Sequence, residues 1–144
     1  MHVRVHRAFL PHLDPAASLA LYRDVLGLEV REDVGSGSLR WLTFAPAAPS
    51  DEASGSGGAA LVLGPPIASH GVTQAEHRTV RELMAKGVYA TVSLATGDLA
   101  GAFARVEACD VVDLLQEPAR RPFGGVDFAF LDPAGNVVRV VEAP

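Results

Sequence analysis

Cysteine is nearly absent from this sequence of 144 residues, in which Cys109 is the single thiol. One cysteine excludes an internal disulfide and suits a reducing compartment, and a chain of this length can fold as one domain without such a cross-link. The sequence also lacks a basic and apolar N-terminal leader and any run of about 18 apolar residues. We therefore expect a soluble cytoplasmic protein.

Positive charge is scarce and scattered along the chain. The sequence has 12 Lys and Arg against 17 Asp and Glu, which gives a net charge of −5. No basic cluster is present that would attract nucleic acid or an anionic membrane, so neither partner is expected. Nucleophile motifs such as Gly-x-Ser-x-Gly are missing too, and the glycine clusters at 35–37 and 55–58 lack the strand-to-helix setting of a phosphate loop. A small molecule is the expected partner.

The most informative stretch is residues 126–142, where two runs of aromatic and β-branched residues flank a turn at 132–136. The proline of this turn fixes φ near −65°, and its glycine or asparagine can adopt positive φ, so the stretch predicts a β-hairpin. Alternation along the second strand places Arg139 on the same face as Val137 and Val141. An arginine in such a valine-rich strand either reaches water from a strand end or belongs to a site.

The chain as a whole predicts one series of elements that occurs twice. Each half has a strand, a helix capped by an aspartate (Asp14 or Asp98) and three further strands, and the two aspartates are 98 − 14 = 84 residues apart. A helix with a capping box at its start links the halves. Residues 46–58 have no apolar period and are expected to form a mobile connecting loop. The expected elements are strands over 2–10, 28–34, 39–44, 59–63, 88–94, 111–116, 128–131 and 137–141, and helices over 14–27, 73–86 and 98–109.

Residues 22–28, Tyr-Arg-Asp-Val-Leu-Gly-Leu, and the Asp-Pro-Ala-Gly-Asn turn at 132–136 resemble the paired signatures of the vicinal oxygen chelate superfamily. This superfamily includes glyoxalase I, extradiol dioxygenases and bleomycin-resistance proteins. The resemblance implies an α+β fold of two tandem βαβββ modules, whose curled mixed sheets enclose a groove. It further implies one glyoxalase/bleomycin-resistance-type domain over 1–144, with module 1 at 1–66, a linker helix within 67–87 and module 2 at 88–144.

In the enzymes of this superfamily, a divalent metal lies in the groove, held by His, Glu or Gln from the first and last strands of each module. The resemblance places the corresponding positions at Arg7, Thr91, Arg139 and within 60–63, and none of these supplies an ordinary ligand. One guanidinium about 5 Å from a divalent cation costs roughly 6 to 7 kcal/mol at an effective dielectric constant of about 20. We therefore expect no metal and no other cofactor.

The candidate ligand-binding residues are those expected on the faces that line the groove. They are Arg7, Phe9, Trp41, Thr43, Tyr89, Thr91, Phe128, Phe130 and Arg139. The aromatic members would form a wall for a flat or apolar ligand, although the phenylalanines suit a core under the helices equally well. The arginines either pair with a carboxylate such as Asp127 or Glu29, or offer a planar fork to an anionic ligand. No catalytic residue is identified.

These features predict metal-independent binding of a small, partly aromatic molecule, which is acidic if the two arginines are free, as in the drug-binding, antibiotic-resistance members of the superfamily. The alternative is a glyoxalase- or dioxygenase-type enzyme, a lyase, isomerase or oxygenase, that uses unconventional metal ligands or metal-free chemistry. A third possibility is a dimeric partner module with an empty groove. Metal content separates the first two, and a ligand-induced rise in Tm separates the first from the third.

A symmetric homodimer is expected, because curled sheets leave exposed edges that a second copy can cover. His2, Arg4 and His6 on the first strand are then near the interface. A surface or interface position is also expected for His12, in the turn before the first helix.

Overall fold

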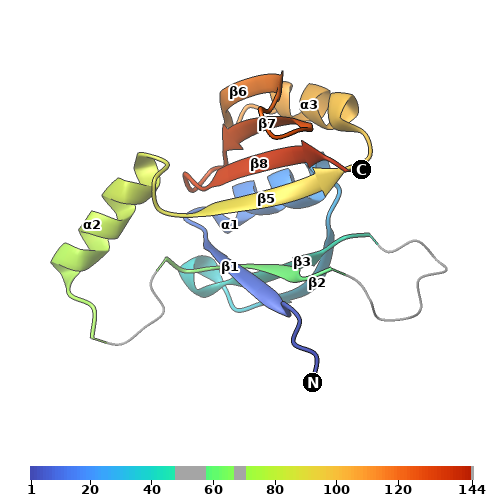
Figure 1. Ribbon diagram of the computed structural model, residues 1–144. Coiled ribbons are helices and arrows are strands. Elements are labelled where there is room, and N and C mark those ends of the chain that lie inside the picture. The colour runs from blue at the N-terminus through green and yellow to red at the C-terminus, as the bar shows by residue number, and fades with distance from the viewer. Residues whose placement is uncertain (48–57, 67–70, 144) are drawn as a thin grey trace.

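The computed structural model describes residues 1–47, 58–66 and 71–143. They form two four-stranded mixed sheets with the strand orders β1-β4-β3-β2 and β5-β8-β7-β6 (Figure 1). In each sheet the first strand pairs in parallel with the last, and the other neighbours pair antiparallel. This confirms the α+β fold of two βαβββ units, and the sheets are not closed into a barrel.

The elements have the following bounds in chain order. They are β1 (Arg7–Pro11), α1 (Pro15–Leu19), the π-helical η1 (Ala20–Val25), β2 (Glu29–Val34), the 3-10 turn η2 (Gly37–Leu39), β3 (Trp41–Ala45), β4 (Ala60–Gly64), α2 (Gln74–Ala85), β5 (Thr91–Thr96), α3 (Leu99–Glu107), β6 (Asp113–Arg120), β7 (Val126–Leu131) and β8 (Val137–Glu142).

The helix starts follow the predicted capping residues. Asp14 and Asp98 each accept a hydrogen bond from the N–H three residues further on, at 3.2 Å and 2.9 Å. Thr73 and Glu76 form a capping box at the start of α2. These bonds satisfy N–H groups that a helix leaves without an internal partner.

Two elements differ from their predicted form. The first strand was expected over 2–10, but β1 begins only at Arg7. Its partner β4 begins at Ala60, which lies opposite Arg7, so residues 1–6 have no strand to pair with. They lie outside the sheet and are exposed. The first helix changes from an α to a π turn, with the Leu26 N–H bonded to the Leu21 carbonyl at 2.9 Å. The wider turn buries Leu21 and its neighbour Tyr22 together.

The core lies between the two sheets, where α1 with η1, and α3, cover the inner face of each sheet (Figure 1). We call the opposite faces, which none of the helices in the described residues covers, the outer faces. Alternation along the strands separates the two faces. The buried inner-face residues are Leu10, Leu42, Phe44, Leu61 and Leu63 of the first sheet and Phe128, Phe130, Val138 and Val140 of the second.

The two signature peptides bind each other across the module boundary. The Tyr22 hydroxyl donates a hydrogen bond of 2.7 Å to Asp132, whose carboxylate also accepts from the backbone N–H groups of Ala134 and Asn136. The Asn136 side chain donates to Asp132 and to the Pro11 carbonyl of β1. Burial, and then the nearby Asp132 carboxylate, raise the pKa of Tyr22 well above its usual value. The phenol therefore stays protonated and keeps donating.

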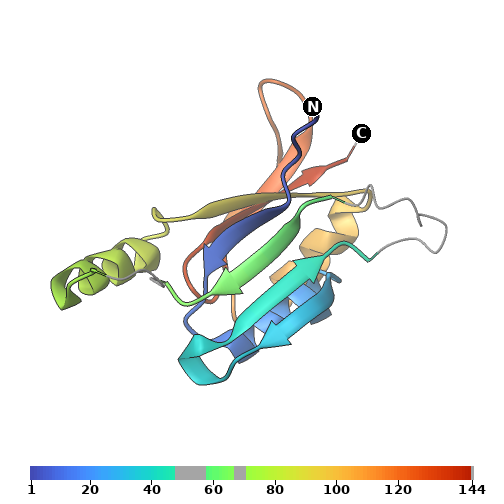
Figure 2. The ribbon, with the colours of Figure 1, turned by 90° about the horizontal axis from the view of Figure 1, so that it is seen from below.

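Helix α2 projects away from both sheets in both views (Figures 1 and 2). Met84 near its end is its one buried residue. Gly135 in the hairpin turn has φ +87°, and a Cβ at this position would overlap the Met84 carbonyl oxygen. The end of α2 thus rests on the turn at 132–136.

Most of the loop predicted for residues 46–58 lies outside the described residues. None of the described helices is long and apolar enough to cross a membrane.

Candidate ligand-binding site

The outer face of the first sheet carries four of the predicted site residues, which are Arg7, Phe9, Trp41 and Thr43. Strand register places Phe9 of β1 opposite Val62 of β4, and Val62 opposite Thr43 of β3. Trp41, two residues before Thr43, lies on the same face. Phe9 is 66% exposed and Trp41 is half-buried, whereas Thr43 is buried between its neighbours.

Three aromatic side chains meet at one end of this face, in an open hollow of about 250 Å³. Phe9 and Trp41 come from the first sheet, and Tyr89 comes from the segment that leads into β5. Gly64 explains the position of the indole ring, because a Cβ on Gly64 would overlap it. The rest of the lining is Leu10, Pro11, Gly64, Pro65, Pro66 and Ala90. We call this site the aromatic hollow.

The outer face of the second sheet carries Thr91, Ser93 and Arg139. Thr91 and Ser93 are exposed, and Ser93 lies beside Arg139 in the ladder. On the other side of Arg139 lies Ala129. The Arg139 side chain is 31% exposed on this face.

Arg139 is paired, which is one of the two alternatives that the sequence leaves open. Its Nη1 lies 3.1 Å from Asp127 Oδ2 and 3.2 Å from Gln116 Oε1. The same Asp127 oxygen lies 3.2 Å from the Nε of Arg121, and Gln116 donates to Asp127 Oδ1 at 3.0 Å. Asp127 is 3% exposed. We call these four residues the Asp127 network.

Arg7 is paired as well, on the first sheet. Its Nη2 lies 3.2 Å from Oε1 of Glu32, a β2 residue that lies opposite Thr43 on the same outer face, and both side chains are open to solvent. Glu29, which the sequence offers as a partner, pairs with Arg31 instead at 3.5 Å. Of the two alternatives left open for each arginine, the structure therefore shows pairing with a carboxylate.

Phe128 and Phe130 do not lie on an outer face. Both are 0% exposed, and Phe128 packs edge-on against Phe103 of α3 with ring centroids 5.2 Å apart. Their place in the groove wall is therefore corrected to a place in the core, which is the alternative named for the phenylalanines. The alternation of β7 turns Asp127 and Ala129 outward and the two rings inward.

His12 is not at the surface, contrary to expectation. It is 1% exposed, and its Nε2 lies within hydrogen-bonding distance of the Arg40 carbonyl. The backbone N–H of His12 donates to the Gly64 carbonyl at 2.8 Å, just beyond the last paired residue of β1.

The residues at the superfamily's ligand positions do not fit a divalent metal. Arg7 and Arg139 are cations already paired with carboxylates, Thr91 offers a neutral hydroxyl, and 60–63 is an apolar strand segment. Within residues 1–47, 58–66 and 71–143, no group of three or more His, Cys, Asp or Glu side chains could hold a metal ion.

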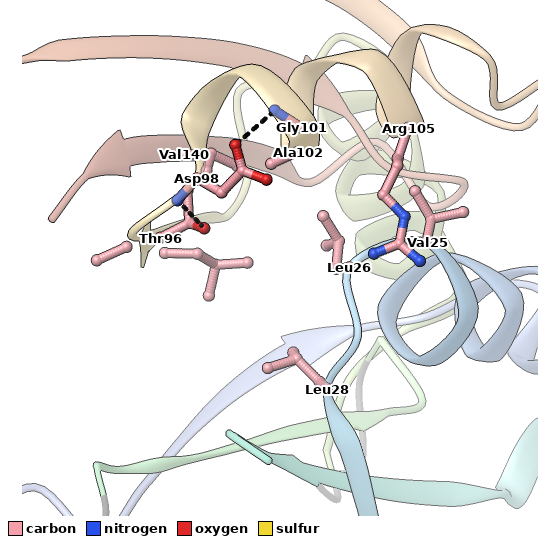
Figure 3. A pocket seen from close by; sticks show the side chains of 11 residues that line it. Val25, Leu26, Leu28, Thr96, Asp98, Gly101, Ala102, Arg105 and Val140 are labelled. Atoms are coloured by element: carbon pink, nitrogen blue, oxygen red, sulfur yellow. Dashed lines mark hydrogen bonds between the residues drawn. The ribbon is translucent and has the colours of Figure 1, made fainter. Parts of the chain in front are cut away.

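A second hollow, of about 240 Å³, opens between the modules (Figure 3). Residues 25–28 form one wall, β5 and α3 form the other, and Arg105 reaches towards Val25. Asp98 faces this space, but its carboxylate caps α3 by accepting from Gly101. We regard the aromatic hollow as the stronger candidate, because it gathers three accessible aromatic side chains.

Sequence reasoning missed several contributors to the outer faces. The Gly-Pro-Pro segment at 64–66 reads as a strand terminator, yet it forms one wall of the aromatic hollow. The sequence around Gln116 and Arg121 does not indicate that they lie beside Asp127. Contacts of this kind depend on strand register.

Three comparisons relate the chain to known proteins. Residues 4–140 match the sequence profile described as Glyoxalase/Bleomycin resistance protein/Dioxygenase superfamily. No curated protein matches the chain. The crystal structure of UcmS2 is 30% identical, with a TM-score of 0.75 and coverage of 99% of this chain and 100% of that one.

Two further crystal structures are more distant. TnmS3, an antibiotic binding protein from Streptomyces sp. CB03234, is 21% identical, with a TM-score of 0.64 over 99% of this chain and 98% of that one. A lactoylglutathione lyase from Agrobacterium tumefaciens is 20% identical, with a TM-score of 0.65 over 99% and 96%. Likeness at these identities shows a shared fold.

Proposed function

Because the chain belongs to the Glyoxalase/Bleomycin resistance protein/Dioxygenase superfamily, we propose that it binds a small, partly aromatic molecule on its outer faces without a metal ion. The observation that carries this proposal is the meeting of Phe9, Trp41 and Tyr89 in one open hollow. Flat aromatic rings stack on such side chains, and each pair is worth about 0.5 to 1.5 kcal/mol beyond the area buried.

The size of the hollow limits what it can hold. Its volume of about 250 Å³ lies just below the roughly 300 to 1,000 Å³ of most small-molecule pockets. A ligand of two or three rings would fill it and extend along the outer face. Phe9, which is largely exposed, would lose its contact with water on binding, which favours association.

Metal independence is supported by the residues at the superfamily's ligand positions. Two of them, Arg7 and Arg139, are cations. They form ion pairs with Glu32 and Asp127, so these two carboxylates already have a positively charged partner other than a metal ion. No arrangement of catalytic groups among the described residues favours the glyoxalase- or dioxygenase-type alternative. The lyase relative shares the fold, which supports many unrelated activities.

The biological setting follows from the same proposal. TnmS3 is described as an antibiotic binding protein, and we propose that this chain likewise binds an antibiotic-like molecule. We further propose that the protein acts in the cytoplasm as a homodimer. A reducing compartment keeps the single thiol of Cys109 free.

The test uses Trp41, the only tryptophan, as a reporter inside the hollow. Titration with 4-biphenylmethanol, a flat neutral probe, is expected to change Trp41 emission and to raise the Tm. Phe9→Ala should weaken binding about five- to tenfold, since it removes one stacking partner. Phe123→Ala is the matched control, because Phe123 is fully exposed in the turn between β6 and β7. No change in emission or Tm, or equal losses in both variants, would contradict the proposal.

A further inference from the structure

The Asp127 network holds more positive than negative charge. It contains one carboxylate and two guanidinium groups, and Gln116 is neutral. The buried, negatively charged carboxylate of Asp127 needs one positive charge beside it, and a single arginine supplies that charge. The second arginine leaves one unit of positive charge at this place, on a chain whose net charge is −5. The surplus is therefore local and can attract an anion.

The two guanidinium groups keep unused donors that can reach solvent. Among the described residues, Arg139 makes its contacts through Nη1, so its Nε and Nη2 have no protein acceptor. Arg121 makes contacts through Nε and Nη1, which leaves Nη2. The side chains of Arg139 and Arg121 are 31% and 45% exposed. A guanidinium has five N–H donors in a fixed plane, so both groups can bind a further acceptor while holding Asp127.

The network also fixes the arginines in place before any ligand arrives. Gln116 Oε1 accepts from Arg139 at 3.2 Å and from Arg121 at 3.4 Å, while its amide donates to Asp127. Both guanidinium groups are therefore joined through shared partners. Preorganised donors lose less conformational entropy on binding than free side chains do.

The network lies along the same strand face as the aromatic hollow. Tyr89 lines the hollow, and alternation from Tyr89 through Thr91 to Ser93 leads to the ladder position beside Arg139. Ala90 already belongs to this ladder, because its carbonyl accepts from the Val137 N–H. Tyr89 and Ser93 are four positions apart along extended chain, a distance of roughly 13 Å at about 3.3 Å per residue.

We propose that the Asp127 network is the anion-binding subsite for the acidic group of an extended aromatic ligand, whose rings occupy the aromatic hollow. This inference rests on the function proposed above and narrows the ligand class to elongated aromatic acids. Carboxylates suit the subsite best, because their two oxygens match the guanidinium plane. Ser93, exposed beside Arg139, offers a further hydroxyl donor.

The test compares two three-ring probes of the same shape, p-terphenyl-4-carboxylate and p-terphenyl-4-methanol, by Trp41 emission and by Tm, because three rings are long enough to span the roughly 13 Å between Tyr89 and Ser93. The acid is expected to bind the wild-type protein at least about tenfold more tightly, as one charge-assisted hydrogen bond predicts. Arg139→Gln and Arg121→Gln should each remove about tenfold of the acid's affinity and change the alcohol's less than about twofold. Raising NaCl from about 0.05 to 0.5 M should weaken the acid alone.

Arg120→Gln is the matched control for these variants. Arg120 precedes Arg121 and carries the same charge, but among the described residues its side chain has no hydrogen bond or ion pair with Asp127 or Gln116. Equal effects of Arg120→Gln and Arg121→Gln, or equal affinities of the wild-type protein for acid and alcohol, would overturn the subsite while leaving the aromatic hollow in place. Failure of both probes to bind would overturn the proposed function itself. The salt comparison needs no variant, so the inference can be tested even if a substitution unfolds the protein.

Discussion

At the scale of single residues, the Tyr22 hydroxyl joins the two halves of the chain. It donates to Asp132, 110 positions away in the sequence, inside a region with no access to water. Tyr22→Phe keeps the ring but leaves the carboxylate with one donor fewer. We expect a loss of about 1.5 to 3 kcal/mol in the free energy of unfolding, measured with urea at pH 7. A variant within about 0.5 kcal/mol of wild type would show that the bond contributes little.

The same residue predicts how stability depends on alkaline pH. The pKa of Tyr22 is raised in the folded state, so its contribution is complete below the unfolded-state pKa of about 10. It decreases as pH rises from there towards the folded-state pKa, because only the unfolded chain loses the proton. The difference in stability between wild type and Tyr22→Phe should therefore be smaller at pH 11 than at pH 7. A constant difference would contradict the raised pKa.

At the scale of elements, the hairpin turn at 132–136 lies directly against the end of α2. Gly135 combines φ +87° with a position against the Met84 carbonyl, so Gly135→Ala is both strained and obstructed. We expect a loss of about 3 kcal/mol or more on urea unfolding. Gly125→Ala is the control, since Gly125 has φ +80° and open space around it, and should cost about 1 to 2 kcal/mol. Equal losses would mean that α2 does not rest on the turn.

Local signals explain which elements could be predicted from sequence. The caps at Asp14, Asp98 and Thr73 act through bonds to the third residue further on, so their pattern is visible in the sequence alone. The extent of β1 depends instead on its partner β4, and the π turn in η1 depends on packing of Tyr22 against the second module. Tertiary contacts decide such features, and no local pattern encodes them.

The candidate site shows the same division. Alternation assigns Arg139 and Asp127 to strand faces, and their pairing was one of the expected alternatives. Alternation does not reveal which face of β7 meets the core, and for this reason Phe128 and Phe130 were misplaced. The Trp41 ring of β3 packs directly over Gly64 of β4. These two residues are more than twenty positions apart in the sequence, so only the folded chain reveals their contact.

At the scale of the whole molecule, the outer faces, the first six residues and the projecting α2 leave much apolar surface open. Val3, Val5 and Val88 are exposed in addition to Phe9. We expect a symmetric homodimer that covers part of this surface, with twice the chain mass of 15.1 kDa by light scattering at micromolar concentration. Val88→Asp should weaken the dimer, whereas Val111→Asp, an exposed valine next to β6, should not. A monomer mass for the wild-type protein would rule out this expectation.

The central claim is that the outer faces bind an aromatic molecule without a metal ion, and one calorimetric comparison tests it most directly. Protein dialysed against EDTA is titrated with 4-biphenylmethanol, and the titration is repeated after stoichiometric zinc, manganese or iron(II) is added back. We predict the same affinity in every titration, since Arg7 and Arg139 occupy two of the positions from which ligands would come. Binding that disappears with EDTA and returns with one of the metals would contradict the account.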